Sequence, residues 1–599
     1  MKNPQAMGGR SREGGRELLK GRDIKYIYKH LWHYFSRYKW TFLCALILTC
    51  VSGILGITGT SLAGEAIGAI TGEAERGVFY YLIKMVVFYT ISTVISYFLS
   101  VLMISLSQKM SSEMRKDVYD KLVTLPVGFF DKRQAGELVS TVTYDVNTVN
   151  ESVANDLIQI VNSIVTVIYS FILMLTVSPL LVLVFAVTIP LSIICTTVIG
   201  KIVRPLFRRR SATLAKMNGY AEEMIAGGRT VRTYGAEAAV TDGFCRLNDE
   251  ASLAYARAEA NGTMAGPTVN FVNNLSLALV NIVGAILYMT GAGLSLTGLS
   301  QFVLLSRKFS GPINQIANIY ADIQSALAAS ERVFRLIDEQ PEKPDAENAL
   351  ALEVTEGEVE LSRVNFGYDP EAVILKELSI KAKPGSVVAI VGPTGAGKTT
   401  VINLLMRFYD ISSGQIQVDG QDIYSVTRDS LRRAYTMVLQ ETWLFHGTVF
   451  ENVAYGKENA TREEVEAVCR AAKIHSFIEA LPDGYDTVLS EAAVNISKGQ
   501  KQLLTIARAM LIESNMLILD EATSNVDSKT ERDISDAMVG LMKGRTCFVI
   551  AHRLSTVKNA DVILVVKNGA VVESGTHEQL LLADGEYAAI YRAQFDLQG

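Results

Sequence analysis

Long apolar runs occur only in the first part of this chain, before about Phe334. A helix that crosses a membrane needs about 20 consecutive, mostly apolar residues, and six segments reach that length. Residues 24–338 are therefore predicted to form an α-helical six-span membrane domain. The expected spans are residues 40–64, 79–106, 157–177, 180–200, 269–291 and 299–324.

The residues before the first span divide into two parts. Residues 1–23 are rich in Gly and Arg and are expected to be disordered. In Ile24–Lys39, aromatic side chains interleave with Lys and Arg, a pattern typical of an amphipathic helix. We expect this helix to lie at the membrane interface before span one.

Two long connections between the expected spans are polar but keep a helical pattern. Residues 107–154 and 204–260 contain neither an apolar span nor a Gly/Pro-rich loop. We therefore expect spans two to five to extend as helices beyond the bilayer and to form two elbows. The candidate coupling residues are Phe129, Phe130 and Asp131 in the first elbow, and Glu223 and Gly227 in the second.

Basic residues predict the orientation of the spans. The segment before span one and both elbows are rich in Lys and Arg, whereas Arg76 is the one clear cation in the opposite connections. Because Lys and Arg accumulate in cytoplasmic loops, we expect the N-terminus, the elbows and the second half of the chain to be cytoplasmic. The membrane is then the plasma (inner) membrane of the cell.

The pattern changes after Asp338. Residues 339–348 are charged and contain Pro, as expected of a linker, and from Val354 onward strand and helix signals alternate. The sequence thus predicts a second domain, residues 349–599, with an α/β fold.

One motif of this second domain joins an apolar strand to a helix. The strand Val387–Val391 is followed by Gly-Pro-Thr-Gly-Ala-Gly-Lys-Thr-Thr. In such a P-loop, glycines let backbone amides point at phosphate oxygens, and the helix end, the Lys and a hydroxyl with Mg²⁺ neutralise the remaining charge. The predicted nucleotide-binding residues are Gly392, Pro393, Thr394, Gly395, Ala396, Gly397, Lys398, Thr399 and Thr400, with Thr399 also a metal ligand.

A second apolar strand, Met516–Leu519, ends in an acidic pair, Asp520 and Glu521. Such a pair on the surface is common without any role. Together with a phosphate loop, however, one carboxylate can hold Mg²⁺ and the other can position or deprotonate water. We therefore predict Asp520 as a metal ligand and Glu521 as the catalytic base.

Charge and cysteine content narrow the classes of function. Charged residues make up 20% of the 599 residues, the net charge is −5, and no long basic tract occurs, so nucleic acid is not an expected partner. The six cysteines form no Cys-x-x-Cys pair and no Cys/His metal-ligand spacing. They are expected to be free thiols in a reducing compartment.

Between the two strands stands Asn495-Ile496-Ser497-Lys498-Gly499-Gln500-Lys501-Gln502, which runs into a helix. With the phosphate loop before it and the acidic pair after it, this segment resembles the signature of the ATP-binding cassette (ABC) transporter family. The chain is similar to an exporter half-transporter, in which a membrane domain precedes a P-loop NTPase cassette. The resemblance implies ATP and Mg²⁺ as cofactors, and ATP hydrolysis coupled to transport.

The resemblance also implies roles for residues outside the phosphate loop. Tyr368 is similar to the aromatic residue that stacks on adenine, and Gln440 to the glutamine that contacts Mg²⁺ and water. In this family the signature binds ATP held by a second cassette, so each site needs two chains. The remaining implied residues are Ser497, Gly499 and Gln500 in the signature, Asp527 in the loop that communicates between sites, and His552 as the switch histidine.

The signature departs from the usual Leu-Ser-Gly-Gly-Gln, because Ile496 and Lys498 replace its Leu and its first Gly. Glu521 and His552 are kept. In family members with two unlike halves, a drifted signature accompanies the half that keeps a working Glu and His. The combination favours a heterodimer with a second half-transporter chain over a homodimer.

Polar residues within the expected spans allow two interpretations. A charge inside lipid is costly, so Arg307 is expected to face a water-filled cavity or a partner. The Asn residues either line a substrate path or form hydrogen bonds between helices. The candidate residues are Asn270, Asn274, Asn281, Arg307, Asn314 and Asn318.

Taken together, these patterns predict ATP-driven export of amphiphilic substrates such as drugs, lipids or peptides, by alternating access within the lipid bilayer. The alternative is an ATP-gated channel or a regulatory membrane protein with the same fold. Glu521 favours export, because gating needs nucleotide binding more than turnover. The sequence leaves the substrate itself open.

Overall fold

A computed structural model describes residues 21–73, 76–291, 293–369, 372–440, 442–489, 496–520, 527–551 and 557–595. The chain forms two compact units. The helical unit comprises Met1–Thr124 and Gln134–Glu339, and the α/β unit comprises Leu125–Arg133 and Gln340–Gly599. A short segment of the first elbow therefore belongs to the α/β unit.

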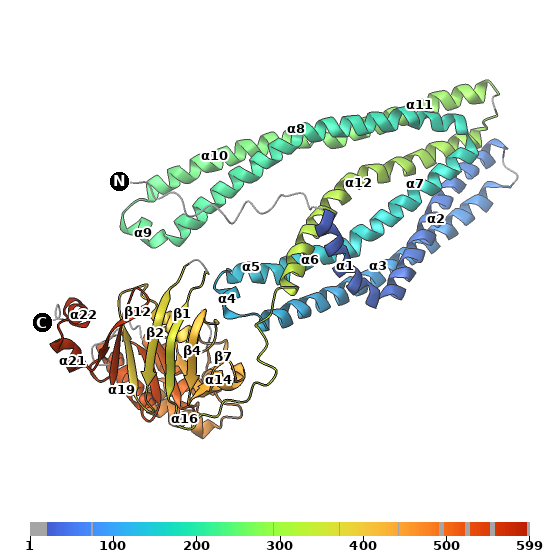
Figure 1. The fold of residues 1–599 in the computed structure, drawn as a ribbon. Helices are drawn as coiled ribbons and strands as arrows, with labels where there is room; N and C mark the ends of the chain where they lie inside the picture. Colours follow the sequence, from blue (N-terminus) through green and yellow to red (C-terminus); the bar gives the residue numbers. More distant parts are fainter. Residues whose placement is uncertain are drawn as a thin grey trace. The chain divides into compact units, whose positions relative to one another are not determined.

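The helical unit consists of long helices joined by short turns, as labelled in Figure 1. Two short π-helical turns, η1 (Thr141–Asp145) and η2 (Ser152–Asp156), interrupt the return from the first elbow. The helices are α1 (Gly21–Arg37), α2 (Lys39–Thr71), α3 (Val78–Val123), α5 (Ala135–Ser140), α6 (Val146–Glu151), α7 (Leu157–Val177), α8 (Pro179–Ala226), α9 (Gly228–Thr233), α10 (Glu237–Gly262), α11 (Ala265–Met289) and α12 (Leu296–Ile337).

Within the described residues, five helical stretches are long and apolar enough to cross a membrane. They contain the first four expected spans and residues 269–289 of the fifth, and at most 28% of their most apolar windows is buried within the chain. The sixth expected span, residues 299–324, lies in α12, which is not among the five. Arg307, Lys308 and neighbouring polar residues make α12 less apolar, so the sixth span stays a prediction.

Spans two and four continue as helices well past the expected bilayer, as their polar helical pattern predicted. Helix α3 has 46 residues and α8 has 48. At about 1.5 Å per residue each is about 70 Å long, more than twice the hydrocarbon thickness of about 30 Å. In Figure 1, α8 runs beside α10 and α11 over most of its length.

Small residues let α2 and α12 approach closely. A Cβ atom on Gly68 would lie 1.8 Å from Oγ1 of Thr297, and one on Gly64 would lie 2.7 Å from the backbone nitrogen of Gln301. Glycines in such contacts allow the dispersion forces between membrane helices to act at short range. Larger residues at either position would separate the two helices.

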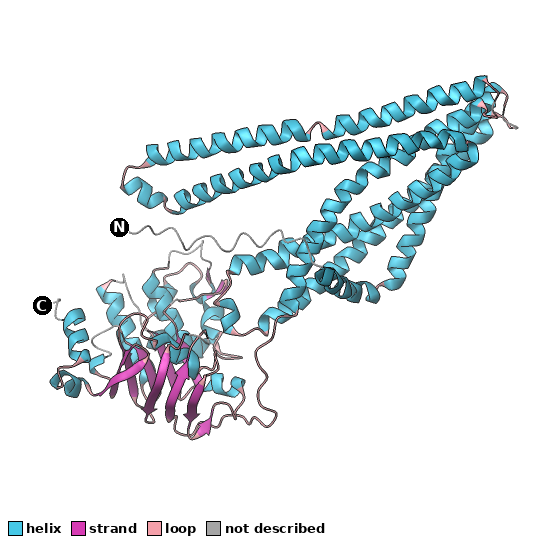
Figure 2. Ribbon diagram, turned by 45° about the horizontal axis from the view of Figure 1, so that its top comes forward, coloured by secondary structure: helices cyan, strands magenta, loops and turns pink. Residues whose placement is uncertain are grey.

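The α/β unit contains two main sheets, whose strands are magenta in Figure 2. One is antiparallel, in the order β2-β1-β4-β5. The other has the order β12-β11-β3-β10-β9-β6, and all its strands except β12 are parallel. The strands are β1 (Val359–Phe366), β2 (Leu375–Ala382), β3 (Val387–Val391), β4 (Ser413–Val418), β5 (Gln421–Asp422), β6 (Tyr435–Val438), β7 (Gly447–Thr448), β8 (Val488–Leu489), β9 (Met516–Asp520), β10 (Thr546–Ile550), β11 (Val562–Lys567) and β12 (Ala570–Gly575).

Both faces of the parallel sheet are buried, which explains why its strands are apolar throughout. Ala389 and Leu517 belong to one hydrophobic core, whereas Val388 and Ile518 belong to the other. The helices that accompany the sheets are α4 (Val127–Phe130), α13 (Lys398–Leu405), α14 (Arg428–Ala434), α15 (Val449–Ala454), α16 (Arg462–Ala471), α17 (His475–Glu479), α18 (Lys498–Met510), α19 (Ser528–Met542), α21 (His577–Leu582) and α22 (Glu586–Phe595).

Part of the expected linker, residues 339–348, is fixed on the α/β unit by ion pairs. Arg428 donates from Nη1 to Asp345 at 2.7 Å, and Arg432 donates from Nη2 to Glu342 at 2.5 Å. The Arg428 side chain is buried, and a buried charge is costly without a partner. The segment from Glu342 to Asp345 is therefore held in place rather than free.

Asp419 stabilises the α/β unit, because its carboxylate accepts backbone N–H groups of Thr355, Glu356, Gly357 and Glu358 at 2.6–3.1 Å. Burial opposes the charge, but these amides lower the pKa of Asp419 below its ordinary value. Since folding lowers this pKa, the stabilisation is full above the unfolded-state pKa of about 3.9. It is lost as the pH falls through the folded-state pKa.

We expect Asp419→Asn to lower the free energy of unfolding by about 2 kcal/mol, because hydrogen bonds to a charged group are worth about 1.5–3 kcal/mol. Thermal unfolding of the purified full-length chain at pH 7 measures this. Asp429→Asn is the control, because Asp429 is exposed and its ion-pair partner among the described residues, Arg433, is exposed too. Equal melting temperatures for the two variants would contradict the prediction.

Candidate nucleotide site

The loop between β3 and α13 has a backbone that suits phosphate binding. Gly392, Gly395 and Gly397 have φ values of 154°, 82° and 100°, and Gly397 is the residue before the first turn of α13. This conformation is easy for glycine and strained for other residues. It turns the chain sharply, so that loop amides and the positive end of α13 can meet an anion.

Two of these glycines are also needed because their neighbours are close. A Cβ atom on Gly392 would lie 2.1 Å from the carbonyl oxygen of Val566, and one on Gly397 would lie 2.7 Å from Cδ2 of Leu375. The first contact is with rigid backbone of β11. The loop shape is thus fixed by the sheet beneath it.

Lys398 folds back over this loop. Its Nζ donates hydrogen bonds to the carbonyl oxygens of Gly392 at 2.8 Å and Pro393 at 3.1 Å. Burial lowers the pKa of Lys398, although the nearby Asp520 carboxylate opposes this shift. A second anion in the loop would favour the charged ammonium further.

The other loop residues differ in exposure. Pro393, Thr394, Gly395 and Thr399 are exposed, whereas Ala396 and Thr400 are buried. The Thr400 hydroxyl lies 3.4 Å from that of Tyr368. The contact of Thr400 with a nucleotide stays a prediction.

The strands that carry the other predicted residues end at the same edge of the sheet. Asp520, the last residue of β9, is level with Ile550 of β10, which is level with Ile390 of β3. Gln440 is exposed and follows β6 by two residues, next to β9. Glu521 and His552 lie outside the described residues, but they follow Asp520 and Ala551 directly in the chain. Parallel strands thus place Gln440 and Asp520 at the sheet edge that carries the phosphate loop.

The predicted metal ligands at this edge supply only oxygen. They are the Thr399 hydroxyl, the Gln440 side-chain amide and the Asp520 carboxylate. Mg²⁺ prefers oxygen ligands, and it commonly takes one or two carboxylates together with substrate phosphates and water. The donor set fits this ion.

Tyr368 follows β1 and is 39% exposed. Its ring meets those of Phe366 and Tyr409 edge to face, with centroids 5.0 and 4.9 Å apart. Its hydroxyl accepts a hydrogen bond from Asn403 of α13 at 3.1 Å. The ring is therefore held beside the phosphate-loop helix, and its stacking on adenine stays a prediction.

The signature segment begins α18 with a capping box. Ser497 accepts from the Gln500 backbone N–H, and the Gln500 side chain accepts from the Ser497 N–H. Ser497 and Lys498 are exposed, and Gly499 is buried. The helix end is thus stabilised internally but accessible, an arrangement that the Ser-x-x-Gln spacing could have indicated.

Asp527 has a similar structural role. Its carboxylate accepts the backbone N–H groups of Lys529 at 3.1 Å and Thr530 at 3.0 Å, at the start of α19. These hydrogen bonds lower the pKa of Asp527. Asp527 is therefore an N-cap residue, and its communication role stays a prediction.

The coupling residues of the first elbow lie in the α/β unit. Helix α4 carries Phe129 and Phe130, and Asp131 follows it. Tyr409 donates its hydroxyl hydrogen bond to the Asp131 carboxylate. Because Tyr409 also contacts Tyr368, side-chain contacts lead from the elbow to α13. The sequence analysis missed Tyr409, which belongs to no motif.

The coupling residues of the second elbow, Glu223 and Gly227, lie at the end of α8. The Gly227 N–H donates to the Glu223 carbonyl at 2.9 Å, which ends the helix. None of the described residues of α9 is buried, and flanking Ile225 and Tyr234 are 80% and 82% exposed. This second elbow thus presents a partly apolar surface.

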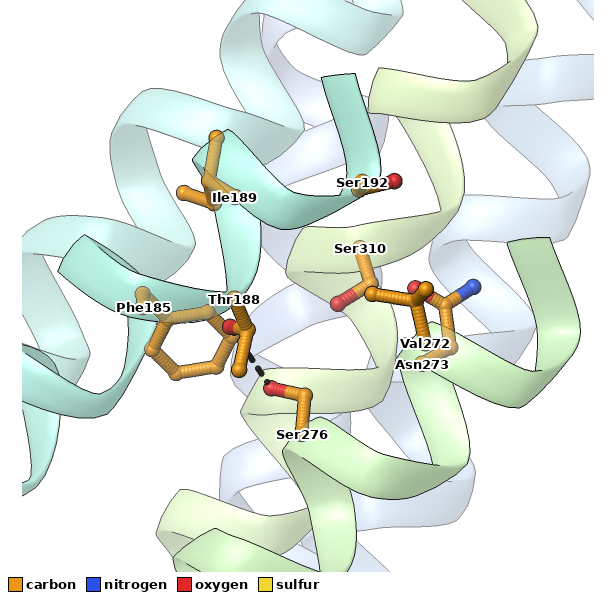
Figure 3. A pocket seen from close by; sticks show the side chains of 8 residues that line it. All are labelled: Phe185, Thr188, Ile189, Ser192, Val272, Asn273, Ser276 and Ser310. Carbon is orange, nitrogen blue, oxygen red and sulfur yellow. Dashed lines mark hydrogen bonds between the residues drawn. The ribbon is translucent and has the colours of Figure 1, made fainter. Parts of the chain in front are cut away.

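None of the described candidate substrate-path residues lines the cavity found among the expected spans. Asn270, Asn274 and Asn281 lie on an exposed face of α11, and Arg307 is exposed on α12. The side chains of Asn314 and Asn318 lie outside the described set. This small cavity is lined by Phe185, Thr188, Ile189, Ser192, Val272, Asn273, Ser276 and Ser310 (Figure 3).

The polar residues of this cavity come from α8, α11 and α12. Thr188 and Ser276 are buried, and their hydroxyls are 3.1 Å apart. Hydroxyl groups on apolar spans gave no periodic signal, so the sequence analysis did not single them out. They form a polar cluster inside the bundle of expected spans.

The two parts of the chain match two family descriptions. Residues 42–313 match the ABC transporter transmembrane region, and residues 375–524 match the ABC transporter domain. The second match includes the phosphate loop, Gln440, the signature and Asp520. This agrees with the resemblance seen in the motifs.

Whole-chain comparisons extend this agreement. The chain is 38% identical over 586 residues to the uncharacterized ABC transporter ATP-binding protein YfiC of Bacillus subtilis, covering 98% of this chain and 97% of the relative. It is 44% identical over 486 residues to the fatty acid ABC transporter ATP-binding/permease protein of Mycobacterium tuberculosis, covering 81% and 76%.

A solved structure of a bacterial Atm1-family ABC exporter with ATP bound has a similar fold. The TM-score is 0.74 at 28% sequence identity, over 93% of this chain and 98% of that chain. The chain therefore belongs to the ABC transporter family, as an ATP-hydrolysing exporter with its membrane region and its cassette in one polypeptide.

Proposed function

We propose that this chain is one half of a dimeric exporter that moves a fatty-acid-like or lipid-like amphiphile across the plasma membrane. The observation that carries the proposal is the position of the first elbow, where Asp131 and Tyr409 connect α4 to Tyr368 beside α13. An elbow held against the nucleotide helix can transmit closure of the cassettes to the spans. The fatty acid transporter among its relatives supports the substrate class.

ATP phosphates are proposed to lie in the loop Gly392–Thr400, with Lys398 turning from its carbonyl partners to the anion. Tyr368 supplies the surface for adenine. Mg²⁺ would be held by Thr399, Asp520 and Gln440, and would neutralise phosphate charge when bound. Glu521 deprotonates the attacking water, and His552 donates a hydrogen bond to the terminal phosphate.

The accessible start of α18 is proposed to complete the site of a second chain. Ser497 and the amides of α18 form another positive helix end, so a nucleotide held between two such ends joins two cassettes. Asp527 would communicate between the two sites. The second elbow, with Glu223, Gly227 and its exposed apolar residues, would dock on the partner chain.

We propose that the partner is a different half-transporter, because Lys498 stands exposed at a signature position that is usually glycine. A homodimer is the competing arrangement. Purifying the chain expressed alone distinguishes them. Robust substrate-stimulated ATPase from a homodimer would reject the heterodimer but leave export intact.

Transport is tested with inverted membrane vesicles and a fluorescent palmitate analogue, with and without a candidate partner chain. We expect accumulation that requires Mg-ATP and the cytoplasmic orientation of the cassette. Nucleotide-dependent ion current without accumulation would instead favour an ATP-gated channel. If neither accumulation nor ion current is observed, both the proposed substrate and the channel alternative are contradicted.

Gly128→Val tests the elbow contact. A Cβ atom at Gly128 would lie 2.7 Å from Cε1 of Tyr409, so the ring must move and its contact with Tyr368 should be lost. We expect stimulation of ATPase by substrate to disappear while ATP binding stays within about twofold. Gly136→Val is the control, because a Cβ at Gly136 meets nothing within 4 Å. Normal stimulation in Gly128→Val would argue against this route.

A further inference from the structure

Two helices of the helical unit lead directly into the α/β unit. Helix α3 ends at Val123, just before the elbow segment Leu125–Arg133, and α12 ends at Ile337, just before Gln340. Any movement of the α/β unit therefore pulls on the ends of both helices. Whether the spans respond together depends on how firmly α3 and α12 are joined.

Helix α1 is attached to the extension of α3. The Tyr34 hydroxyl donates to the Asp117 carboxylate at 2.6 Å. Tyr38, which follows α1, donates to Glu113 at 2.7 Å, and Arg37 pairs with the same carboxylate at 3.1 Å. Burial and the Asp117 hydrogen bond raise the pKa of Tyr34, so its hydroxyl stays a donor at neutral pH.

The same helix is attached to the last turn of α12. The Tyr26 hydroxyl donates to the Asp338 carboxylate at 2.6 Å, and the Nε2 atom of His30 lies 3.1 Å from the same carboxylate. The rings of His30 and Tyr34 stack on Phe334, with centroids 5.1 and 6.1 Å apart. Phe334 and Tyr34 are buried, so these contacts form a small core between α1 and α12.

These contacts hold α1 against the extensions of α3 and α12 beyond the expected spans, and its position at the membrane interface stays a prediction. At about 1.5 Å per residue, Glu113 lies about 10 Å beyond the expected end of span two, and Asp338 about 20 Å beyond that of span six. Since α1 contacts both, it runs along the cytoplasmic extensions. The aromatic pattern of Ile24–Lys39 reflects packing on α3 and α12 as well as amphipathicity.

The π-helical turn η1, which follows the first elbow, is attached to α12 by a separate ion pair. Arg332 donates from Nε and Nη2 to the Asp145 carboxylate at 2.9 and 2.6 Å, in bidentate geometry. Asp145 is almost fully buried in η1. Such forked pairs are geometrically specific. All three helical segments that meet the elbow and the linker are thus joined to one another.

We propose that α1 is a brace that makes α3 and α12 move as one body when the cassettes close, with Tyr34 and Tyr26 as its positioning residues. The proposal rests on the proposed export function. Closure of the cassettes then moves α3 and α12 at the same time. Less of the ATP-driven movement is lost because the two helices do not bend relative to each other. Neither tyrosine is among the residues proposed to bind or hydrolyse the nucleotide.

The first test compares Tyr34→Phe and the Tyr26→Phe/Tyr34→Phe double variant in nanodiscs and vesicles. Both keep the rings and remove only the hydroxyls. We expect the palmitate analogue transported per ATP hydrolysed to fall about threefold in the single and about tenfold in the double variant, with basal ATPase within twofold. Those decreases correspond to about 0.7 and 1.4 kcal/mol of coupling.

Tyr28→Phe is the matched control, because Tyr28 lies on α1 but is exposed and stacks only on Trp32 among the described aromatic residues. It should retain the wild-type ratio. If all variants transport the same amount of palmitate analogue per ATP hydrolysed, the brace proposal is wrong. A parallel loss of ATPase and melting temperature would also overturn it, since the hydroxyls would then be needed only for folding.

A second test does not depend on the substrate. In a background without the six native cysteines, Tyr34→Cys and Asp117→Cys are joined by a short reducible crosslinker. If α1 and α3 move together, the crosslinked chain keeps its ATPase turnover. Turnover that stops on crosslinking and returns with reductant would overturn the brace. If instead the wild type hydrolyses ATP without moving the palmitate analogue, the proposed substrate is wrong. The crosslinking experiment still tests the brace, because it measures only ATPase turnover.

Discussion

Glu521→Gln is expected to stop ATP turnover while the protein keeps its bound nucleotide. Strand β9 ends at Asp520, which is level with β10 and the phosphate-loop strand β3, and Glu521 is the next residue in the sequence. A glutamine there can still hold a water molecule but cannot accept its proton. General bases contribute about 10²–10⁴-fold to rate, so we expect kcat to fall at least about 100-fold.

The variant is also expected to accumulate as a closed dimer with ATP on its cassettes. Steady-state phosphate release and retention of radiolabelled ATP after gel filtration measure the two effects. Glu513→Gln is the control, since Glu513 is an exposed carboxylate in the turn before β9. Wild-type turnover in Glu521→Gln would overturn the assignment of the base. Loss of ATP retention together with turnover would indicate damage to the binding site instead.

Lys398→Met should weaken ATP binding rather than only slow its hydrolysis. The ammonium group already lies over the loop, 2.8 Å from the Gly392 carbonyl, and no other described cation shares these loop carbonyls. Charged hydrogen bonds are worth about 1.5–3 kcal/mol, so we expect Kd for Mg-ATP to rise about 10- to 150-fold. Methionine keeps most of the stem volume, which limits effects on packing.

Binding of a fluorescent ATP analogue to the full-length chain measures this change. Lys383→Met is the control, because Lys383 is exposed before β3 and its ammonium has no recorded partner among the described residues. An unchanged Kd with reduced turnover would mean that Lys398 acts only on the reacting phosphate. Its role in holding ATP would then be wrong.

The phosphate loop was predictable because its determinants are local. A buried strand, three glycines with positive φ and a helix occupy adjacent residues, so the sequence pattern and the geometry coincide. The same holds for Asp520, since a parallel strand fixes where its last residue emerges. The lengths of α3 and α8 were predictable because a helical period continues where apolarity stops.

Contacts between distant segments were not predictable in this way. Tyr409 lies in no motif, and only the fold places it between Asp131 and Tyr368. The packing of α1 on α3 and α12 was missed for the same reason, because its aromatic residues fit both a lipid interface and a protein surface. The polar cavity around Thr188 and Ser276 depends on three helices meeting, which no single span reveals.

The fixed stretch from Glu342 to Asp345 matters for engineering chimeras of related transporters. Exchanging cassettes at the middle of residues 339–348 would separate Glu342 or Asp345 from Arg432 and Arg428, so that buried Arg428 or half-buried Arg432 loses a carboxylate partner. A fusion point between Asp338 and Gln340 keeps those acids with their own arginines. Hybrids joined there should express and fold better than hybrids joined a few residues later.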